Sequence, residues 1–472
     1  MKKEAERKAE VLDLLKKQKI RNVKDIESYK LSVCHPASAG IDLGSRSNYV
    51  AINPEIAAEM DVPVVTEFST MTSGHEACRD FLLSCGVKTV SMESTSVYWM
   101  NLYYTLTEAG IEVFLVNPRK FRMVPGRKTD VLDCQWLQTL HMYGLLSGSL
   151  IPEDRIRQLR SYMRQRDSLL KDRNRYVQRM QKALIQMNLM LPNVVDDITG
   201  KTGDAIVSAI ISGERDPKTL ASMRDYRCKH PVEDIEAALT GCYKDDQLYL
   251  LKINHDAYAF FTSQIAEIDK QIGAILKTFP LKADAGATVK KHKQESRKNS
   301  IRAGYKLDDM LLRICGVDLT TITGLQANTI LQIISEVGLD MGKFRSAKAF
   351  TAYLSFAPRN KITGGVVVSS KTDRVRSSAS QAFKKVIPSI SQGKSAYAAF
   401  YRRVAAHSGT GKAIVATCRK LATTFYNVLK YGTEFVEEGD KRYKERLVVK
   451  ERNTLIKLAK KHNLTLVPAI AS

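Results

Sequence analysis

The 472-residue sequence lacks the features that mark secreted, membrane and zinc-stabilised proteins. Its eight cysteines are scattered and form no CxxC pair, which argues against structural zinc and favours reduced thiols in a cytosol. No apolar run is long enough to cross a bilayer, and the charged segment Met1–Lys8 has no apolar core of a signal peptide. These absences predict a cytoplasmic protein without a membrane partner.

Acidic residues are scarce relative to basic ones. The chain has 50 Asp and Glu against 73 Lys and Arg, which gives a net charge of +23. Such a charge repels itself unless a polyanion shares the surface, so nucleic acid is the first partner to expect. With 44% hydrophobic residues the chain can bury real cores, and its length predicts two to four domains.

The sequence between residues 36 and 150 predicts an α/β domain. Ala39–Leu43 is typical of a buried strand, Gly44 of a turn, and Tyr49–Ile52 of a second strand paired with the first as a hairpin. Further strands are predicted at 62–68, 87–93 and 112–118, and helices at 73–85 and 99–109. This order predicts a mixed sheet covered by helices on both faces.

Four acidic residues fall where such a fold would gather them. Asp42 and Glu93 each end a predicted strand, and strand ends of this kind meet at a crevice beyond the sheet. Asp130 and Asp133 share one face of a helix for which Thr129 is a suitable N-cap. Taken singly, an acid at a strand end can be structural, and acids are favourable at a helix N-terminus. Together they predict oxygen ligands for the divalent cations that assist phosphoryl transfer.

Basic residues precede the third and fourth acids. Arg119–Arg122 and Arg127–Lys128 would hold phosphates beside the predicted site. Without the acids nearby, solvated surface charge would be the better explanation of these runs.

These residues together resemble the RuvC-like DEDD domain of the IS110 family of insertion-sequence transposases. The resemblance is carried by Asp42, Glu93 and the run Lys128–Asp133, and Asn117-Pro118 and Trp136-Leu137 fit the same pattern. It implies a ribonuclease-H-like fold and Mg²⁺ held by the four acids. It also implies a DNA recombinase that is guided by a structured bridge RNA and associates with the bacterial nucleoid.

Residues 151–306 predict a helical coiled-coil arm that carries an insert and a basic linker. Two apolar series with heptad spacing run from Ile156 to Leu191 and from Leu251 to Phe279, on either side of an insert at about 192–245. Ordinary core packing would explain one series, but two long ones predict an antiparallel arm. In the resembling family this arm carries dimerisation, so a homodimer or tetramer is expected. The basic stretch 282–306 predicts a linker or an RNA-contacting loop.

Two arginines fall within the first apolar series. Arg166 and Arg173 share its register, and a buried cation is costly unless it is paired. Either the series is interrupted there, or both side chains reach acids or phosphate. The nearby Arg160 and Arg164 lie on the polar face and are expected to be solvated.

Residues 307–440 resemble the second, mostly helical transposase domain of the same family, and residues 441–472 predict a charged tail. The resemblance is carried by Phe356–Gly365 and by the basic, serine-rich segment 369–378. In the family, a serine shortly after Pro-Arg and just before a glycine is the nucleophile that joins covalently to DNA. The matching residue here is Thr363, which departs from the pattern.

The threonine leaves three possibilities open. Thr363 has a hydroxyl of similar acidity, although its methyl group crowds the attack. Alternatively, Ser369 or Ser370 has taken over the role, or strand joining is impaired. Because a hydroxyl beside a flexible glycine suffices for the chemistry, Thr363 is the favoured nucleophile.

The expected function is therefore a transposase or recombinase of a mobile element. It would cleave and exchange DNA strands with metal assistance, through a covalent hydroxyl-linked intermediate and with RNA guidance. The alternative is a RuvC-like nuclease that uses metal-activated water and has no need of Thr363. A third, non-enzymatic possibility is a nucleic-acid-binding protein with an inactive nuclease fold, against which the intact set of four acids argues.

Overall fold

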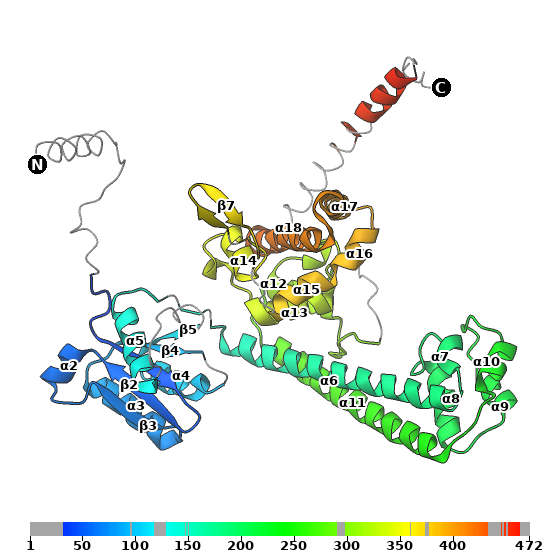
Figure 1. Ribbon diagram of the computed structural model, residues 1–472, viewed down its shortest axis with the longest axis horizontal. Helices are drawn as coiled ribbons and strands as arrows, with labels where there is room; N and C mark the ends of the chain where they lie inside the picture. The colour runs from blue at the N-terminus through cyan, green and yellow to red at the C-terminus, as the bar shows by residue number, and fades with distance from the viewer. Residues whose placement is uncertain are drawn as a thin grey trace, which may run out of the picture. The chain divides into compact units, whose positions relative to one another are not determined.

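The computed structural model describes residues 32–94, 97–117, 129–146, 148–149, 151–289, 298–358, 360–372, 377–432, 445, 448–449 and 452–462 (Figure 1). The chain divides between Ile151 and Pro152 into two compact units. Each unit has a hydrophobic core of its own.

The first unit is built on a five-stranded sheet in the order β3-β2-β1-β4-β5. The first three strands are antiparallel neighbours, whereas β4 lies parallel to β1 and β5 parallel to β4. A helix, α4, joins β4 to β5, as a parallel pair requires. The strands are β1 (Ser38–Leu43), β2 (Ser47–Ile52), β3 (Val65–Ser69), β4 (Thr89–Glu93) and β5 (Glu112–Val116), and the helices are α2 (Pro54–Glu59), α3 (Thr72–Ser84), α4 (Trp99–Glu108) and α5 (Asp130–Met142).

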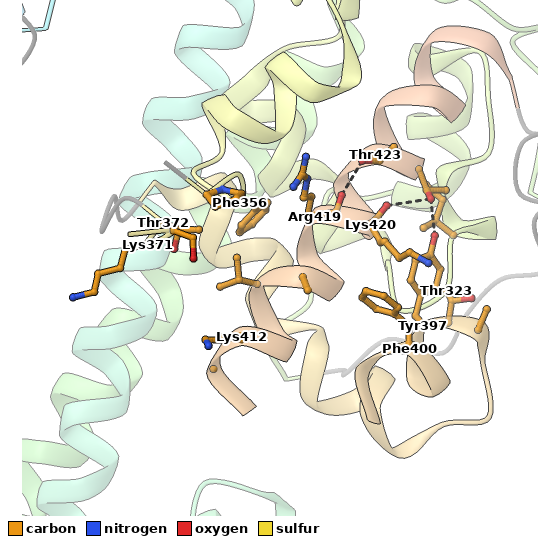
Figure 2. A pocket seen from close by; sticks show the side chains of 18 of the residues that line it. Thr323, Phe356, Lys371, Thr372, Tyr397, Phe400, Lys412, Arg419, Lys420 and Thr423 are labelled. Atoms are coloured by element: carbon orange, nitrogen blue, oxygen red, sulfur yellow. Dashed lines mark hydrogen bonds between the residues drawn. The ribbon is translucent and has the colours of Figure 1, made fainter. Parts of the chain in front are cut away.

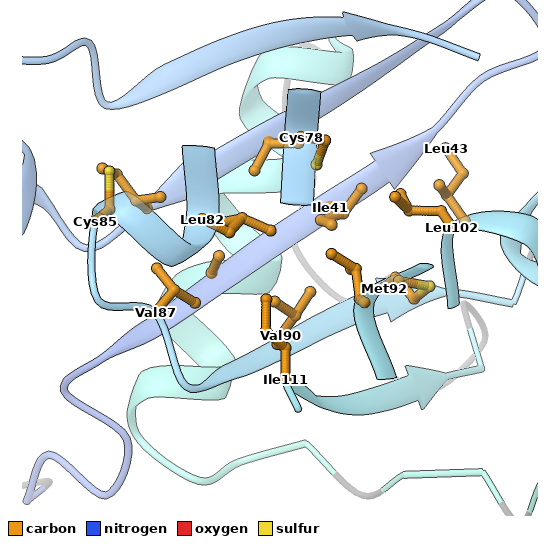
Figure 3. Close-up of a cluster of buried hydrophobic side chains, with 14 of the residues drawn as sticks. Ile41, Leu43, Cys78, Leu82, Cys85, Val87, Val90, Met92, Leu102 and Ile111 are labelled. Carbon is orange, nitrogen blue, oxygen red and sulfur yellow. The ribbon is translucent and has the colours of Figure 1, made fainter. Parts of the chain in front are cut away.

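The two faces of β1 meet different helices. Ala39, Ile41 and Leu43 are buried in the hydrophobic cluster to which α3 and α4 contribute (Figure 3). Side chains alternate along a strand, so Gly40 and Asp42 lie on the opposite face, where Gly40 contacts α5. The prediction of a mixed sheet with helices on both faces is confirmed.

The predicted strands and helices of this unit are present, with their ends shifted by a few residues. The one unpredicted element is α2, which begins after Asn53, whose side chain accepts a hydrogen bond from the amide of Glu55 (3.0 Å). The amide of Val62 bonds to the carbonyl of Ala57 and closes this helical turn (3.0 Å). For this reason the strand expected from residue 62 begins only at Val65.

The second unit contains an antiparallel helical arm. Its two helices, α6 (Asp154–Gln186) and α11 (Asp245–Lys277), pack along each other (Figure 1). Tyr176 stacks on Phe261, with ring centroids 5.3 Å apart, whereas the earlier Arg166 pairs with the later Asp269. The predicted antiparallel arm is thus confirmed. The insert between the two helices forms α7 (Leu191–Val194), α8 (Lys201–Ile211), α9 (Pro217–Ser222) and α10 (Val232–Leu239) around its own core.

The first apolar series of the arm is continuous through its arginines. Arg166 and Arg173 are buried, with exposed fractions of 6% and 4%. Arg166 binds the carboxylate of Asp269 and donates to the carbonyl of Asn299 at 3.0 Å. Arg173 donates to the side-chain oxygen of Asn299 at 2.6 Å. Of the two possibilities left by the sequence, Arg166 follows the second, because it reaches an acid, whereas Arg173 is bound by a neutral amide oxygen.

The expectation that Arg160 is solvated is wrong, whereas Arg164 is exposed as expected, although it is also paired. Arg160 donates to the carbonyls of Ser335 (3.1 Å) and Glu336 (2.6 Å), at the C-terminal end of α13 (Ala327–Val337). Arg164 makes a bidentate contact with the carboxylate of Glu336, at 2.8 and 2.9 Å. Cations bind favourably to the unpaired carbonyls at a helix C-terminus, and these two therefore fasten the arm to α13.

The remainder of the described second unit is mostly helical, with one hairpin. Its longest helix, α18, packs Phe425 and Tyr426 against the rings of Phe350 and Phe383. Residues 452–462 are also helical, and most of the predicted tail lies outside the described residues. The further elements are α12 (Leu307–Cys315), η3 (Leu319–Thr321), η4 (Met341–Lys343), α14 (Ala347–Tyr353), β6 (Lys361–Thr363), β7 (Val366–Ser369), α15 (Ser378–Lys385), α16 (Ile387–Gln392), α17 (Ala396–Ser408) and α18 (Thr410–Tyr431).

Two of the exclusions drawn from the sequence can be compared with the structure. All eight cysteines lie in described residues, and each is a free thiol. Among the helices of the described residues, none is long and apolar enough to cross a membrane.

Candidate functional site

Strand register places the first two acids side by side. β1 and β4 are parallel neighbours in which Ile41 lies opposite Met92, so Asp42 and Glu93 follow at the same level at the ends of the two strands. Gly40 and Ser91, two residues earlier, also lie opposite each other and both contact α5. Because alternate residues share a face, Asp42 and Glu93 lie on the face of the sheet that α5 covers.

Helix α5 can approach this face closely because residue 40 is glycine. A Cβ at that position would lie 2.3 Å from the amide nitrogen of Gln138 and 2.4 Å from the carbonyl oxygen of Cys134. No real side chain tolerates such distances to backbone atoms. Gly40 therefore sets the separation between β1 and the helix that carries the other two acids.

Two hydrogen bonds fix the direction and level of α5 against β4. The side chain of Thr89 bonds to the ring of His141 at 2.9 Å, and the hydroxyl of Ser91 donates to the carbonyl of Leu137 at 3.2 Å. Two strand residues cover about 6.6 Å and four helix residues about 6 Å, so the two elements advance together in opposite directions. Continuing by one step brings Glu93 level with Asp133.

The thiol of Cys134 gives an independent indication of the same convergence. Burial raises its pKa to about 12, and the charges of Asp42 and Asp133 add to that increase. Both acids are therefore near the same sulfur atom, although they come from different elements. Glu93 is buried, Asp42 and Asp133 are half-buried, and Asp130 is exposed, one helical turn further out.

The start of α5 is formed as the sequence predicts. Thr129 is the N-cap, and its hydroxyl accepts a hydrogen bond from the amide of Leu132 at 3.3 Å. Asp130 and Asp133 both fall in the first helical turn. Acids are favourable at this end of a helix, so their placement serves the fold as well as any chemistry.

The four carboxylates suit a hard divalent cation in their chemistry, because such ions prefer oxygen ligands. Among the described residues, however, no three Asp, Glu, His or Cys side chains are grouped so that they could hold one ion. Since the backbone already places Asp42, Glu93 and Asp133 at one level, rotation of their side chains is the movement that ligation would require.

The register also identifies two neighbours that sequence reasoning missed. Tyr49 of β2 lies opposite Asp42, and Glu67 of β3 lies opposite Tyr49, so both continue the row that Asp42 and Glu93 begin. The spacing of the predicted hairpin was a signal in the sequence that could have placed Tyr49 opposite Asp42. The register of β3 has no local signal, and α2 displaces the start of this strand.

The favoured nucleophile, Thr363, lies in the second unit on an exposed hairpin. It ends β6, is exposed, and precedes Gly364 and Gly365, whose φ angles of 56° and 78° are in the left-handed region. The turn thus needs both glycines and leaves the Thr363 hydroxyl accessible.

The two alternative nucleophiles occupy a different place on the same hairpin. Ser369 ends β7, and Ser370 follows it; both line a cavity that Thr363 does not line. The hairpin therefore presents hydroxyls in two environments, one at its tip and one beside the cavity. Several other predicted residues lie outside the described part of the chain, namely the runs Arg119–Arg122 and Arg127–Lys128, Arg359, residues 290–297 of the basic linker, and residues 373–376 of the segment 369–378.

Two family models match the chain. One, described as "Transposase" and built on the IS110 DEDD domain, matches residues 39–189, which include the sheet, α5 and α6. The other, described as "Transposase IS116/IS110/IS902 family", matches residues 318–401, which include the hairpin with Thr363. No curated protein matches the chain. The first match includes the four acids, and the second includes the candidate hydroxyls.

Proposed function

Because the chain belongs to the IS110 family of transposases, we propose that it is a recombinase that cleaves and exchanges DNA strands through a covalent intermediate, guided by a structured RNA. The observation that carries the proposal is the convergence of Asp42, Glu93 and Asp133 at one end of the sheet. Carboxylate oxygens that come from three elements to one level are the kind of ligand that divalent cations prefer.

In this proposal the four acids, Asp42, Glu93, Asp130 and Asp133, hold Mg²⁺. The bound ion would polarise the scissile phosphate and stabilise the charge that develops during its transfer. Glu93 is buried and fixed by the β4 register, so it would supply the most rigid ligand. Asp130 is exposed and would complete the set from the solvent side.

A hydroxyl of the second unit is the proposed nucleophile. Its oxygen attacks the scissile phosphorus, the phosphorus–oxygen bond to the adjacent nucleotide breaks, and the departing oxygen takes up a proton. The hydroxyl's own proton passes to solvent. The step thus exchanges a phosphodiester bond within DNA for one between the protein and DNA. A hydroxyl of a second strand can then attack this bond, which joins the strands and releases the protein hydroxyl without hydrolysis. Exposure and the adjoining glycines favour Thr363, whereas the cavity favours Ser369 or Ser370.

RNA guidance is proposed on the resemblance and on the net charge of +23, which favours polyanionic partners. The alternative function remains a nuclease that uses water in place of the hydroxyl. It shares the four acids and differs only in the absence of a protein–DNA ester.

A suicide-substrate assay tests these proposals together. The protein would be incubated with Mg²⁺, the cognate element ends and co-expressed RNA, and adducts would be separated on denaturing gels. Asp42→Ala, Thr363→Ala and the pair Ser369→Ala with Ser370→Ala would be compared with Thr240→Ala, which removes an exposed hydroxyl from the arm insert.

The adduct should disappear in Asp42→Ala and Thr363→Ala and persist in the other two variants. An adduct that survives Thr363→Ala but requires the two serines would move the nucleophile to the cavity. Cleavage that depends on Asp42 without an adduct in any variant would leave the hydrolytic nuclease. Full activity after removal of the RNA would contradict guidance.

A mixing experiment addresses the separation of acids and hydroxyl between two units. Asp42→Ala and Thr363→Ala proteins would be combined in equal amounts. Recovery of about a quarter to a half of the adduct would show that one subunit supplies acids to another's hydroxyl, as mass action predicts for an assembly of subunits. No recovery would mean that both come from one chain.

A further inference from the structure

A cavity of about 1350 Å³ lies in the second unit, lined by α17, α18 and the end of β7 (Figure 2). Sites for small molecules are typically about 300–1,000 Å³, so this volume exceeds the usual range. An elongated ligand fits such a space better than a metabolite does. The match to the transposase family ends at residue 401, so it does not include α18, which forms one wall.

The charge of the cavity is of one sign. Lys371, Lys412, Arg419 and Lys420 line it, and no Asp or Glu is among the described lining residues. Residues 412 and 419 are seven apart on α18, so they lie on the same face of that helix, two turns from each other. Four cations without a facing carboxylate predict a ligand that carries several negative charges.

Aromatic side chains stand beside these cations. Phe400 of α17 is half-buried, and the ammonium of Lys420 lies 4.3 Å from its ring centroid (Figure 2). Tyr397, one turn earlier on α17, is held by a hydrogen bond between its hydroxyl and the side chain of Thr424 (2.6 Å). Proteins that bind single-stranded nucleic acid combine cations that follow its phosphate backbone with aromatic rings on which the unpaired bases stack.

We propose that this cavity binds an unpaired nucleic-acid strand, with phosphates on Lys412 and Arg419 and a base stacked on Phe400. A paired base cannot present its face to a ring at the side of a duplex, so the ligand must be single-stranded at this point. That the strand is the DNA being exchanged, rather than RNA, rests on the proposed function. Ser369 and Ser370 would then lie beside the bound strand.

Binding is measured separately from strand chemistry. The full chain carrying Asp42→Ala would be titrated, in EDTA, into labelled oligonucleotides of about 12 nucleotides. Single-stranded DNA, single-stranded RNA of the same sequence, and the DNA duplex form three arms. Because no cleavage occurs under these conditions, loss of binding and loss of the covalent step are distinguishable outcomes.

Single substitutions separate charge from stacking. Lys412→Gln and Arg419→Gln should each lower the slope of log affinity against log salt by about 0.7 for a single strand. Phe400→Leu should weaken binding about tenfold at every salt concentration and leave the slope unchanged. The matched controls are Lys348→Gln and Phe260→Leu, which alter an exposed lysine and an exposed phenylalanine outside the cavity.

Photocrosslinking then locates the contact. An oligonucleotide with 5-iodouracil should crosslink to Phe400 or Tyr397 in wild type, and the crosslink should fall at least fivefold in Phe400→Leu. Crosslinks that map only elsewhere, equal binding of the duplex, or equal losses in the control variants would each overturn the proposal. Preference for DNA over RNA would identify the strand as substrate, and the reverse preference would identify it as the guide.

Discussion

The two units of the chain position charge in opposite ways. In the first unit, carboxylates come from the ends of β1 and β4 and from the start of α5, and the backbone sets their level. In the second, the cations around the cavity stand on long side chains, of which Lys412, Arg419 and Lys420 share α18. Backbone register defines position within a narrow range, whereas lysine and arginine side chains adapt to what they bind. The first arrangement suits chemistry and the second suits binding.

This difference predicts that substitutions of the acids aligned by the backbone in the first unit cause large losses of DNA cleavage. On the proposal that Glu93 and Asp133 hold Mg²⁺, Glu93→Gln and Asp133→Asn should each lower DNA cleavage by about 10³-fold, because loss of a metal ligand removes several kcal/mol of transition-state stabilisation. Asp130→Asn should cause a smaller loss, since Asp130 is exposed and one turn away from the level of Glu93. Initial rates of suicide-substrate cleavage at saturating Mg²⁺ provide the measurement.

Equal losses for Asp130→Asn and Asp133→Asn would contradict the expected difference between these two positions. They would mean that α5 turns or shifts on binding DNA, so that its exposed first turn closes over the row. Binding of single-stranded DNA in EDTA serves as the control and should be unchanged in all three variants.

A buried ion pair in the second unit contrasts with the long, adaptable side chains around the cavity. Arg166 and Asp269 have side-chain exposures of 7% and 2%. The second carboxylate oxygen of Asp269 also accepts from the amide of Arg302 at 3.0 Å. Arg166→Met should therefore reduce the free energy of unfolding by about 3–5 kcal/mol, because it leaves a buried carboxylate without its cation. Urea unfolding followed by far-ultraviolet circular dichroism reports mainly on this unit, which contains most of the described helical residues.

A double variant sharpens this test. Arg166→Met combined with Asp269→Leu should recover most of the loss, since replacing both charges by apolar groups removes the desolvation cost as well as the attraction. A double variant as unstable as the single one would show that the amide contact to Arg302 matters more than the ion pair.

One methyl group added at Gly40 tests how closely α5 packs on the sheet of the first unit. Gly40→Ala should cost about 3 kcal/mol of stability, because its Cβ would lie 2.3 Å from the Gln138 amide nitrogen and α5 must move away. The two tryptophans of the chain, Trp99 and Trp136, are both in this unit, so tryptophan fluorescence reports its unfolding alone. Gly148→Ala in the same unit, where the added methyl would meet only the ring of Phe114 at 3.4 Å, an ordinary van der Waals distance, is the matched control.

In Gly40→Ala, cleavage and the binding of single-stranded DNA should respond differently. Displacement of α5 moves Asp133 from the level of Glu93, so cleavage should fall well beyond what the lost stability explains, while the second unit still binds single-stranded DNA. Retained cleavage in Gly40→Ala would show that the row tolerates a shifted helix.

The sequence predicted the individual acids but not the contacts that align them. Asp42 and Glu93 could be placed at strand ends because strand periodicity and the hairpin turn are local signals. The need for glycine at position 40, and the row through Tyr49 and Glu67, follow from register and helix packing, which no short window contains. Local periodicity predicts helices and strands, whereas the positions of their side chains relative to one another depend on tertiary contacts.

Long-range partners were likewise beyond prediction. Arg166 meets an acid 103 residues away, and Arg160 meets carbonyls more than 170 residues away. Periodicity showed that Arg166 lies in a buried register, but it could not name its partner. For Arg160 the same reasoning gave the wrong environment, because the face that was polar in sequence is covered by α13.

The smallest expected effect is a difference in acid sensitivity between the units. His141 of α5 is buried against Thr89 and stacks on His35, with ring centroids 4.8 Å apart. Burial lowers its pKa from 6.5 to about 4, and the charge of His35 acts in the same direction. The unfolded chain therefore binds more protons than the folded one between these values, so the first unit should lose stability as pH falls from 6.5 toward 4. Urea midpoints from tryptophan fluorescence should show this loss, and His141→Gln should reduce it, whereas His255→Gln in the second unit should not. An unchanged pH dependence in His141→Gln would assign the acid sensitivity of this unit to other groups, among them His75 of α3, whose pKa is also lowered by burial.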